Sequence, residues 1–251
     1  MSDLGPVQRQ FGKSAAAYVE SATHAAGEDL ERIAALAIEH GGDRVLDIGT
    51  GVGHTVRRVA PSFRSAVGID ATSEMLRAGR DVLARAGIGH VVLVQADASQ
   101  LPVASRSVDV VTSRLAAHHF VAAEAAFGEI ARVLRPGGLF VLADNFAPAD
   151  PELDRFINEL ERLRDASHVR NHTIAGWHAL VEAAGLVATV DTDRMVTRLE
   201  TESWLARSQT PADRADEVRR RLRDAPQAAM KAFEITATGF VVRKLILTAR
   251  A

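Results

Sequence analysis

Three glycines at alternate positions, Gly49, Gly51 and Gly53, have a spacing that suits ligand binding. They lie in the stretch VLDIGTGVGH and directly follow an apolar run that contains Asp47. Because glycine has no Cβ, such a turn lets the main chain approach a ligand closely and adopt left-handed dihedral angles. A helix that begins there offers free N–H donors and the positive end of its dipole. The pattern predicts a ligand site where a strand turns into a helix.

The spacing and the acid beside it narrow the choice of ligand. His54 stands where the dinucleotide pattern G-x-G-x-x-G would place its third glycine, and the phosphate loop G-x-x-x-x-G-K-[ST] does not match. Asp47 would repel a pyrophosphate and attract a cation. A nicotinamide-dependent dehydrogenase is therefore disfavoured. S-adenosylmethionine fits better, because it joins an adenosine to a sulfonium and an α-ammonium group and carries no phosphate.

Two further acids stand at or after the ends of later apolar runs. Asp70 closes the run 65–70, about 20 residues after the glycine turn, where nucleotide-binding folds place an acid that binds ribose hydroxyls. Asp97 follows the run 91–95, near the expected position of an adenine amino group. Each also has a simpler interpretation. Asp70 could cap the next helix, although Ser73 suits that position better, and Asp97 could be a turn residue.

Short apolar runs rich in β-branched residues alternate with amphipathic stretches along most of the chain. Strands are expected at 44–48, 65–70, 91–95, 108–113, 139–144 and 239–249. Helices are expected at 27–39, 73–86 and 123–134. This alternation is typical of an α/β fold in which helices cover both faces of a doubly wound parallel sheet. The ligand of such a sheet lies beyond the carboxyl ends of its strands, and the first expected strand ends at the glycine turn.

Four stretches resemble, in order, the class I S-adenosylmethionine-dependent methyltransferases, and are similar to the ubiquinone/menaquinone C-methyltransferase-like group. They are VLDIGTGVGH, GIDATSEML, QADASQLPVASRSVDVV and ARVLRPGGLFVLAD, within about residues 40–145. The resemblance implies a seven-stranded, mostly parallel sheet with an antiparallel last strand. It also implies methyl transfer from S-adenosylmethionine to a small-molecule acceptor, which leaves S-adenosylhomocysteine. The alternative is a non-methylating catalyst, such as a cyclase, on the same fold.

The same resemblance implies a cofactor site on this chain. The glycine turn would line the methionine and ribose, Asp70 would bind the ribose hydroxyls, and Asp97 would border the adenine. The end of the strand at 108–113 would lie beside the methyl group. The expected cofactor-binding residues are Asp47, Gly49, Thr50, Gly51, Gly53, Asp70, Ala71, Met75, Asp97, Ala98, Ser113, Arg114 and Leu115.

Polar residues after the strand at 108–113 are candidates for the acceptor side. An acceptor hydroxyl, phenol or acidic carbon must lose a proton, and histidine accepts one near neutral pH, so His118 is the candidate general base. The alternative is a buried histidine that only packs. The residues expected to bind the acceptor are Tyr18, His24, His119, Arg164, His168 and Arg170. No metal site is expected, since no carboxylate completes a ligand set with His168 and His172.

Two segments interrupt the alternation of strands and helices. Residues 146–173 contain a charged amphipathic helix, and residues 202–236 contain two or three short helices. Long insertions in compact domains tend to be lids or binding segments. We interpret residues 1–251 as a single methyltransferase domain, with residues 1–26 as an N-terminal cap and both insertions as a lid over the acceptor site.

Composition limits the partners and the compartment. A net charge of -2 and a pI near 6.5 give no electrostatic signature of nucleic-acid binding. The absence of cysteine excludes disulfides, thiolate zinc sites and cysteine nucleophiles. The sequence has neither the apolar core of a signal peptide nor a run of about 18 apolar residues that could span a membrane. A cytoplasmic protein is expected, and a homodimer is left open.

Overall fold

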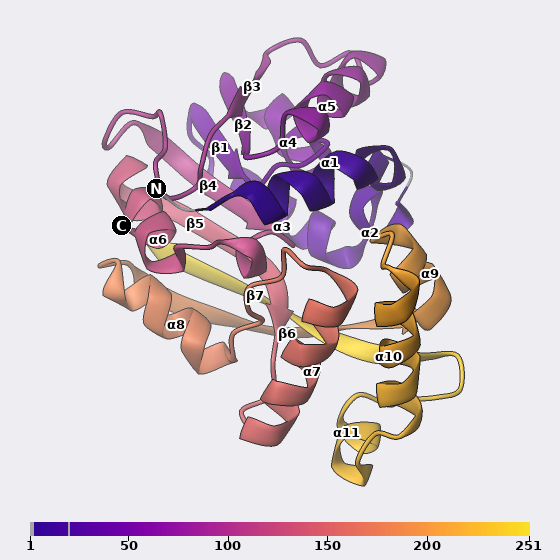
Figure 1. The fold of residues 1–251 in the computed structure, drawn as a ribbon. Helices are drawn as coiled ribbons and strands as arrows, with labels where there is room; N and C mark the ends of the chain where they lie inside the picture. Colours follow the sequence, from indigo (N-terminus) through magenta and orange to yellow (C-terminus); the bar gives the residue numbers. More distant parts are fainter. Residues whose placement is uncertain (1–2, 20) are drawn as a thin grey trace.

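A seven-stranded sheet lies at the centre of the structure, a computed structural model that describes residues 3–19 and 21–251 (Figure 1). The strand order is β3-β2-β1-β4-β5-β7-β6. The strands are β1 (Arg44–Ile48), β2 (Ser65–Asp70), β3 (Val91–Gln95), β4 (Val108–Arg114), β5 (Leu134–Phe146), β6 (Val187–Glu200) and β7 (Gly239–Arg250). β7 is antiparallel to both of its neighbours, whereas the other adjacent pairs are parallel. The expected mostly parallel sheet with a reversed last strand is confirmed.

Helices cover both faces of this sheet. They are α3 (Glu28–His40), α4 (His54–Val59), α5 (Ser73–Arg85), α6 (Ala123–Val133) and α8 (Ile174–Ala183). On one face, Leu30, Ile33 and Ala37 of α3 lie in one core with Val45 of β1 and Val141 of β5. Their spacing of three or four residues gives α3 one apolar stripe. α6 and α8 pack against the other face. The central strands are apolar along their length because both of their sides are buried.

A third apolar core lies at the far ends of β6 and β7. The helices around it are α7 (Pro151–Arg164), α9 (Thr201–Arg207), α10 (Ala212–Arg223) and α11 (Gln227–Ala232). In Figure 1, α7, α10 and α11 lie in the lower part and α9 lies at the right. Trp204 and Phe240 meet edge to face there, with ring centroids 4.9 Å apart, in one cluster with Leu160. At the start of α7, Asp150 accepts hydrogen bonds from two main-chain N–H groups of the first turn. The two helical segments expected at 146–173 and 202–236 therefore share one core.

Some elements were not located by the sequence pattern. The helices α1 (Gly5–Val19) and α2 (Ala22–Ala25) precede α3, and 3₁₀ turns occupy Ala60–Ser62 and Ala117–His119. α1 buries Gln10 and Ser14 together with Val7 and Ala15, so its inner face is not a plain apolar stripe. β6 is an edge strand whose sequence mixes polar and apolar residues without a continuous apolar run, unlike a strand buried on both sides. The sequence pattern does not predict α8 either. Apart from the two 3₁₀ turns, these elements lie outside the part of the chain that carries the family-like motifs.

Two properties of the described residues bear on membranes and metals. None of the helices within residues 3–19 and 21–251 is long and apolar enough to cross a membrane. The same part of the chain brings together no group of three or more His, Cys, Asp or Glu side chains that could hold a metal ion.

Candidate active site

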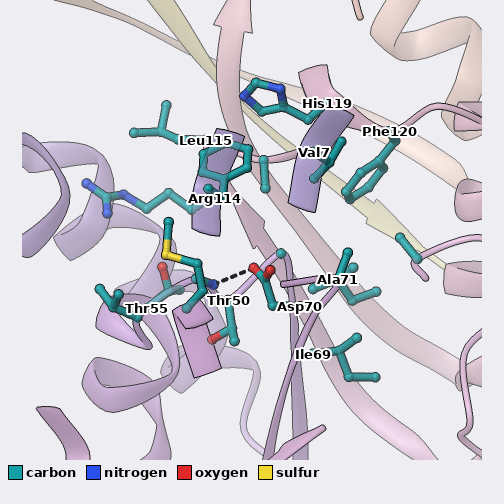
Figure 2. Close-up of a pocket in the computed structure, with 18 of the residues that line it drawn as sticks. Val7, Thr50, Thr55, Ile69, Asp70, Ala71, Arg114, Leu115, His119 and Phe120 are labelled. Atoms are coloured by element: carbon teal, nitrogen blue, oxygen red, sulfur yellow. Dashed lines mark hydrogen bonds between the residues drawn. The ribbon is translucent and has the colours of Figure 1, made fainter. Parts of the chain in front are cut away.

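A cavity of about 110 Å³ opens at the carboxyl ends of β1, β2 and β4, and we call it the first cavity. The glycine turn after β1 forms one wall. Figure 2 shows Thr50 and Asp70 on one side of it and Val7 and Phe120 on the other. The carboxyl edge of the parallel strands is where α/β sheets place their ligands, so this cavity lies where the ligand is expected.

The glycine turn brings main-chain atoms to the cavity wall. Gly49 and Gly51 have φ angles of 68° and 55°, in the left-handed region that favours glycine. A Cβ at Gly49 would overlap the Cβ of Ala116, so a side chain there would push the chain after β4 aside. A Cβ at Gly51 would meet no atom within 4 Å. Gly49 is therefore needed because the chain at Ala116 packs closely against it, whereas Gly51 leaves open space beside the cavity.

Asp70 at the end of β2 lines the cavity and holds the glycine turn. Its Oδ2 accepts a hydrogen bond from the Gly51 N–H at 2.8 Å, the dashed line in Figure 2, and its Oδ1 accepts one from the Thr72 N–H at 2.9 Å. Burial raises the pKa of this carboxyl, although those hydrogen bonds favour its charged form. Thr72, and not Ser73, occupies the N-cap position of α5.

Asp47 lies buried beside the cavity and does not line it. The Thr112 hydroxyl of β4 donates to Asp47 Oδ1 at 2.7 Å, while Oδ2 is buried without a hydrogen-bond partner among the described residues. Burial outweighs the hydrogen bonds and raises the pKa of Asp47 to about 6. The acid thus acts on the cavity only through its charge.

Most of the residues predicted to bind the cofactor line the first cavity. They are Gly49, Thr50, Gly51, Asp70, Ala71, Met75, Asp97, Ala98, Arg114 and Leu115. Gly53 and Ser113 lie outside the lining with Asp47. Gly53 is the N-cap of α4 in a left-handed conformation, and the Ser113 hydroxyl is buried in β4. Asp97 Oδ1 also accepts a hydrogen bond from the Ser99 N–H at 2.9 Å, so it is a turn residue as well as a lining residue.

Helix α1 supplies a wall that the sequence analysis missed. Leu4, Val7 and Phe11 line the first cavity from this N-terminal segment. Their spacing of three and four residues was the signal that could have found them. The Gln8 side-chain amide donates to the Ala71 carbonyl at 3.1 Å and fixes α1 at the rim.

The end of β4 is held by a buried ion cluster. Asp29 of α3 accepts hydrogen bonds from Arg114 Nε at 2.9 Å and from Lys244 Nζ of β7 at 3.2 Å. Burial alone would raise the pKa of Asp29, but both cations lower it below the ordinary value. The next residue, Leu115, has a φ of 52°, and its N–H donates to the Ala143 carbonyl at 2.8 Å. The cluster therefore positions Leu115 in a conformation that is unusual for a residue with a Cβ.

A second cavity of about 50 Å³ adjoins the first. Four residues line both cavities, two from the N-terminal segment and two that follow β4. The shared residues are Tyr18, His24, Leu115 and His119. Arg164 of α7 lines the second cavity, with Arg207 of α9 and Lys244 of β7, which the sequence analysis did not single out.

His118 lines the second cavity as half of a buried pair with Asp144. Its Nδ1 lies 2.6 Å from Asp144 Oδ1, and its main-chain N–H donates to Asp144 Oδ2 at 3.2 Å. Burial alone would lower the pKa of His118, but the charge and hydrogen bond of Asp144 outweigh it and raise the pKa above the ordinary value. With Nδ1–H donating to the carboxylate, Nε2 is the nitrogen that can accept a proton.

The other predicted acceptor residues divide into two groups. The first group, Arg164 and His119, lines the second cavity, where Arg164 forms an ion pair with Glu161 at 3.1 Å. Burial and the charge of His118 lower the pKa of His119 to about 4. His168 and Arg170 line neither cavity. The His168 Nε2 lies 3.0 Å from Asn158 Oδ1, and Arg170 forms an ion pair with Asp154 at 2.6 Å.

The segment that contains His168 and Arg170 nevertheless touches the histidine pair. The main-chain N–H groups of Val169 and Arg170 donate to the His118 carbonyl at 3.1 and 3.0 Å. This segment follows the end of α7 and lies outside helical geometry. Main-chain bonds therefore hold this loop against His118, while the side chains of His168 and Arg170 bond to residues of α7. Direct acceptor contact by His168 or Arg170 does not follow from their positions.

Residues 46–142 match the family described as Methyltransferase domain. The chain is 39% identical to the uncharacterized methyltransferase YcgJ of Bacillus subtilis, over 90% of this chain and 89% of that protein. This chain belongs to the methyltransferase family. The ubiquinone/menaquinone biosynthesis C-methyltransferase UbiE of Ectopseudomonas mendocina is 38% identical over 45% of each chain. Family membership confirms the expected resemblance, and it argues against a nicotinamide-dependent dehydrogenase.

Solved structures of methyltransferase-like proteins share the fold. The crystal structure of B. subtilis YcgJ has a TM-score of 0.82 and 35% identity, over 88% of this chain and 98% of that one. A putative methyltransferase from Bacillus halodurans has a TM-score of 0.85 and 30% identity, over 89% of this chain and 99% of that one. The methyltransferase fold described above thus extends beyond the motif-bearing region to the C-terminal strands.

Proposed function

We propose that this methyltransferase takes its methyl group from S-adenosylmethionine in the first cavity and transfers it to a small molecule in the second. The observation that carries the proposal is that the two cavities adjoin at Tyr18, His24, Leu115 and His119. When bound, S-adenosylmethionine supplies a methyl group on a positively charged, strongly electrophilic sulfur. The chain itself then has to align two molecules and exclude water.

The first cavity suits an adenosine with a positively charged end. The open space beside Gly51 would admit the ligand next to the main chain. Each Asp70 oxygen accepts one main-chain hydrogen bond and can accept a second, here from a ribose hydroxyl. Asp97 would accept a hydrogen bond from the adenine amino group. The buried Asp47 oxygen without a partner adds negative charge that favours a cation over a phosphate.

His118 would accept the proton that the acceptor loses. Asp144 orients the imidazole through Nδ1 and stabilises its protonated form, which are the two things a carboxylate can do for a histidine base. His119 lies beside it and stays neutral near pH 7, because its pKa is about 4. Of the two histidines, only His118 therefore combines a place in the second cavity with a raised affinity for protons.

The helical segments would form the lid over the acceptor. Glu161 and Arg164 reach the second cavity from residues 146–173, and Trp204 and Arg207 reach it from residues 202–236. α10 and α11 share the third core without lining the cavity, so they would support the lid.

Calorimetric titration with S-adenosylhomocysteine tests the cofactor assignment. We expect wild-type protein to bind it and Gly51→Val to lose binding, because the added side chain enters the open space. Gly87→Val is the matched control: Gly87 has a φ of 69°, meets no atom within 4 Å of an added Cβ, and lies on an exposed turn away from both cavities. Equal affinity in wild type and Gly51→Val would contradict the assignment.

The transfer itself is tested by the product. A panel of small acceptors incubated with the protein and S-adenosylmethionine should yield S-adenosylhomocysteine together with a methylated acceptor. Conversion of a panel member without S-adenosylhomocysteine would instead support the non-methylating alternative.

A further inference from the structure

The second cavity has a surplus of positive charge. Three cationic side chains line it, those of Arg164, Arg207 and Lys244, against a single carboxylate in its lining, that of Glu161. Glu161 is paired with Arg164, and Lys244 is paired with Asp29 behind the wall. No ion pair or hydrogen bond joins the Arg207 guanidinium to any residue among those that the structure describes, and its Nε is buried.

Arg207 is partly buried, and a guanidinium with a buried, unpartnered Nε is stabilised when an anion joins it. Burial lowers the pKa of Arg207, and the charge of Arg164 lowers it further. The same field acts on His24, which lines the cavity: burial, then Arg207, hold its pKa well below the ordinary range. Of the three cations that line the cavity, only Arg207 therefore has no carboxylate paired with it among the described residues.

The cationic groups are also held in place. Arg164 stacks over the Trp204 ring, with its guanidinium carbon 4.9 Å from the ring centroid, and it is fixed by Glu161. Arg207 ends α9, three residues after Trp204, and the α9 C-terminus is tied to α1 by the bond from the Gln10 amide to the Ser208 carbonyl at 2.8 Å. A guanidinium on such a support can present two parallel N–H donors to an oxyanion.

We propose that Arg207 binds a carboxylate of the acceptor, so that the substrate is a small organic acid whose reacting group faces His118. The inference rests on the proposed function and names the substrate class of the same site. One unpaired guanidinium matches the single charge of a carboxylate better than the nearly double charge of a phosphate monoester at neutral pH. The small volume of the cavity, about 50 Å³, favours a small acid.

Acetate, acetamide and inorganic phosphate are the probes, titrated into protein saturated with S-adenosylhomocysteine. The readout is the ¹⁵N–¹H signal of Arg207 Nε, assigned by its loss in Arg207→Gln. We expect a saturable shift with acetate and none with the uncharged acetamide. In the Arg207 variants, which lack this signal, acetate affinity is measured by calorimetry. It should fall about tenfold or more in Arg207→Gln, the effect of losing hydrogen bonds to a charged group. Arg207→Lys keeps the charge but loses the two parallel N–H donors. Its acetate affinity should lie between those of the wild type and Arg207→Gln.

Arg223→Gln is the matched control, because Arg223 is an exposed arginine that pairs with Asp224 on the surface of the third-core region. It should leave the acetate response unchanged. The proposal is overturned if acetate gives no saturable shift, if acetamide matches acetate, or if Arg223→Gln weakens acetate as much as Arg207→Gln. Tighter binding of phosphate than acetate would overturn the choice of a carboxylate.

Calorimetry with S-adenosylhomocysteine separates this inference from the proposed function. If S-adenosylhomocysteine binds and acetate does not, the acid substrate fails and the donor site stands. If S-adenosylhomocysteine itself does not bind, the proposed function fails. Turnover gives a second readout: with small hydroxy acids paired with their amides, the preference for the acid should fall about tenfold or more in Arg207→Gln. Release of methanol from the product by mild base would show that the carboxylate is methylated and does not serve as the anchor.

Discussion

The two adjoining cavities are built in different ways. The first combines the glycine turn and short segments that follow the ends of consecutive strands with apolar side chains of the N-terminal segment, and one of its walls is the stretch from Gly49 to Gly51. The second is formed by long, charged or aromatic side chains from segments as far apart as Tyr18 and Lys244. A ligand common to a family can be bound by shared backbone geometry, whereas an individual acceptor needs side chains that each lineage can change. The predictions below test that division, from the largest expected effect to the smallest.

The largest effect is expected in the second cavity. His118→Asn should lower the turnover rate about 10²-fold or more, because a positioned general base contributes roughly 10²–10⁴-fold. The affinity for S-adenosylhomocysteine should stay nearly unchanged, since His118 does not line the first cavity. Stopped-time assays and calorimetry on the same preparation measure both. His178→Asn, at a partly exposed histidine beside Glu182, is the control; if His118→Asn keeps most of its activity, the histidine is structural.

A backbone effect of similar size is expected at the glycine turn. Gly49→Ala combines a left-handed φ, which costs about 1–2 kcal/mol, with overlap against Ala116, which costs about 1–3 kcal/mol more. Gly51→Ala should lose only the first amount of stability, because its Cβ meets open space. Denaturant unfolding of both variants gives the difference. Equal losses would mean that the close approach to Ala116 is easily relieved.

Asp70→Ala should weaken S-adenosylhomocysteine binding by about 1.5–3 kcal/mol, the usual range for hydrogen bonds to a charged group. The variant loses both the expected ribose contact and the bond that holds the Gly51 N–H. Isothermal calorimetry measures the change, with Asp81→Ala on the exposed side of α5 as control. Unchanged affinity would argue that the ribose binds elsewhere.

A smaller change is expected in the pH dependence. Because Asp144 raises the pKa of His118, the base should be protonated at low pH and become active as pH rises through a value above the ordinary 6.5 or so. kcat/KM should therefore fall toward acidic pH in the wild type. Removing the carboxylate in Asp144→Asn should move the midpoint to lower pH, and rate profiles from pH 5 to 9 at constant salt would measure it. A midpoint that moves upward or stays fixed would contradict the role of Asp144.

The smallest effect is expected outside both cavities. Arg170→Gln breaks a partly exposed ion pair with Asp154, and such pairs contribute about 1 kcal/mol or less. Its turnover rate should stay within about twofold of the wild type, with at most that loss of stability. A large fall in turnover with unchanged folding would place Arg170 at the acceptor and weaken the division between the cavities.

Predictability from sequence follows the same division. The strands around the first cavity are buried on both sides, so their continuous apolar runs located them, and the acids at their ends, such as Asp70, were found with them. The α/β fold class was predicted from these runs, whereas the reversed last strand was predicted from the family resemblance, and both are confirmed. Ser113 and Gly53 were expected in the lining because the resemblance carries over stretches of sequence. Alternate side chains along a strand point to opposite faces, which applies to Ser113, whereas Gly53 caps α4.

The second cavity was predictable only in part. His118 stood out because it follows a motif, but its partner Asp144 lies on another strand and becomes visible only when β4 and β5 pair. Arg207 and Lys244 carry no local signal, since an arginine at the end of an exposed-looking helix or a lysine in a strand is usually solvated. His168 was expected at the acceptor from its charged surroundings, yet it bonds with Asn158. Long-range packing decides such cases.

Helix α1 touches both halves of the site and contacts both α5 and α9 (Figure 1). It is bonded to the rim of the first cavity through Gln8 and Ala71, and to the end of α9 through Gln10 and Ser208. One helix thus forms part of the wall of both cavities. Movement of α1 that lets one molecule leave would also loosen the wall around the other. A tightly held acceptor should therefore slow the release of S-adenosylhomocysteine. The two products should leave in a fixed order, and excess acceptor should inhibit turnover.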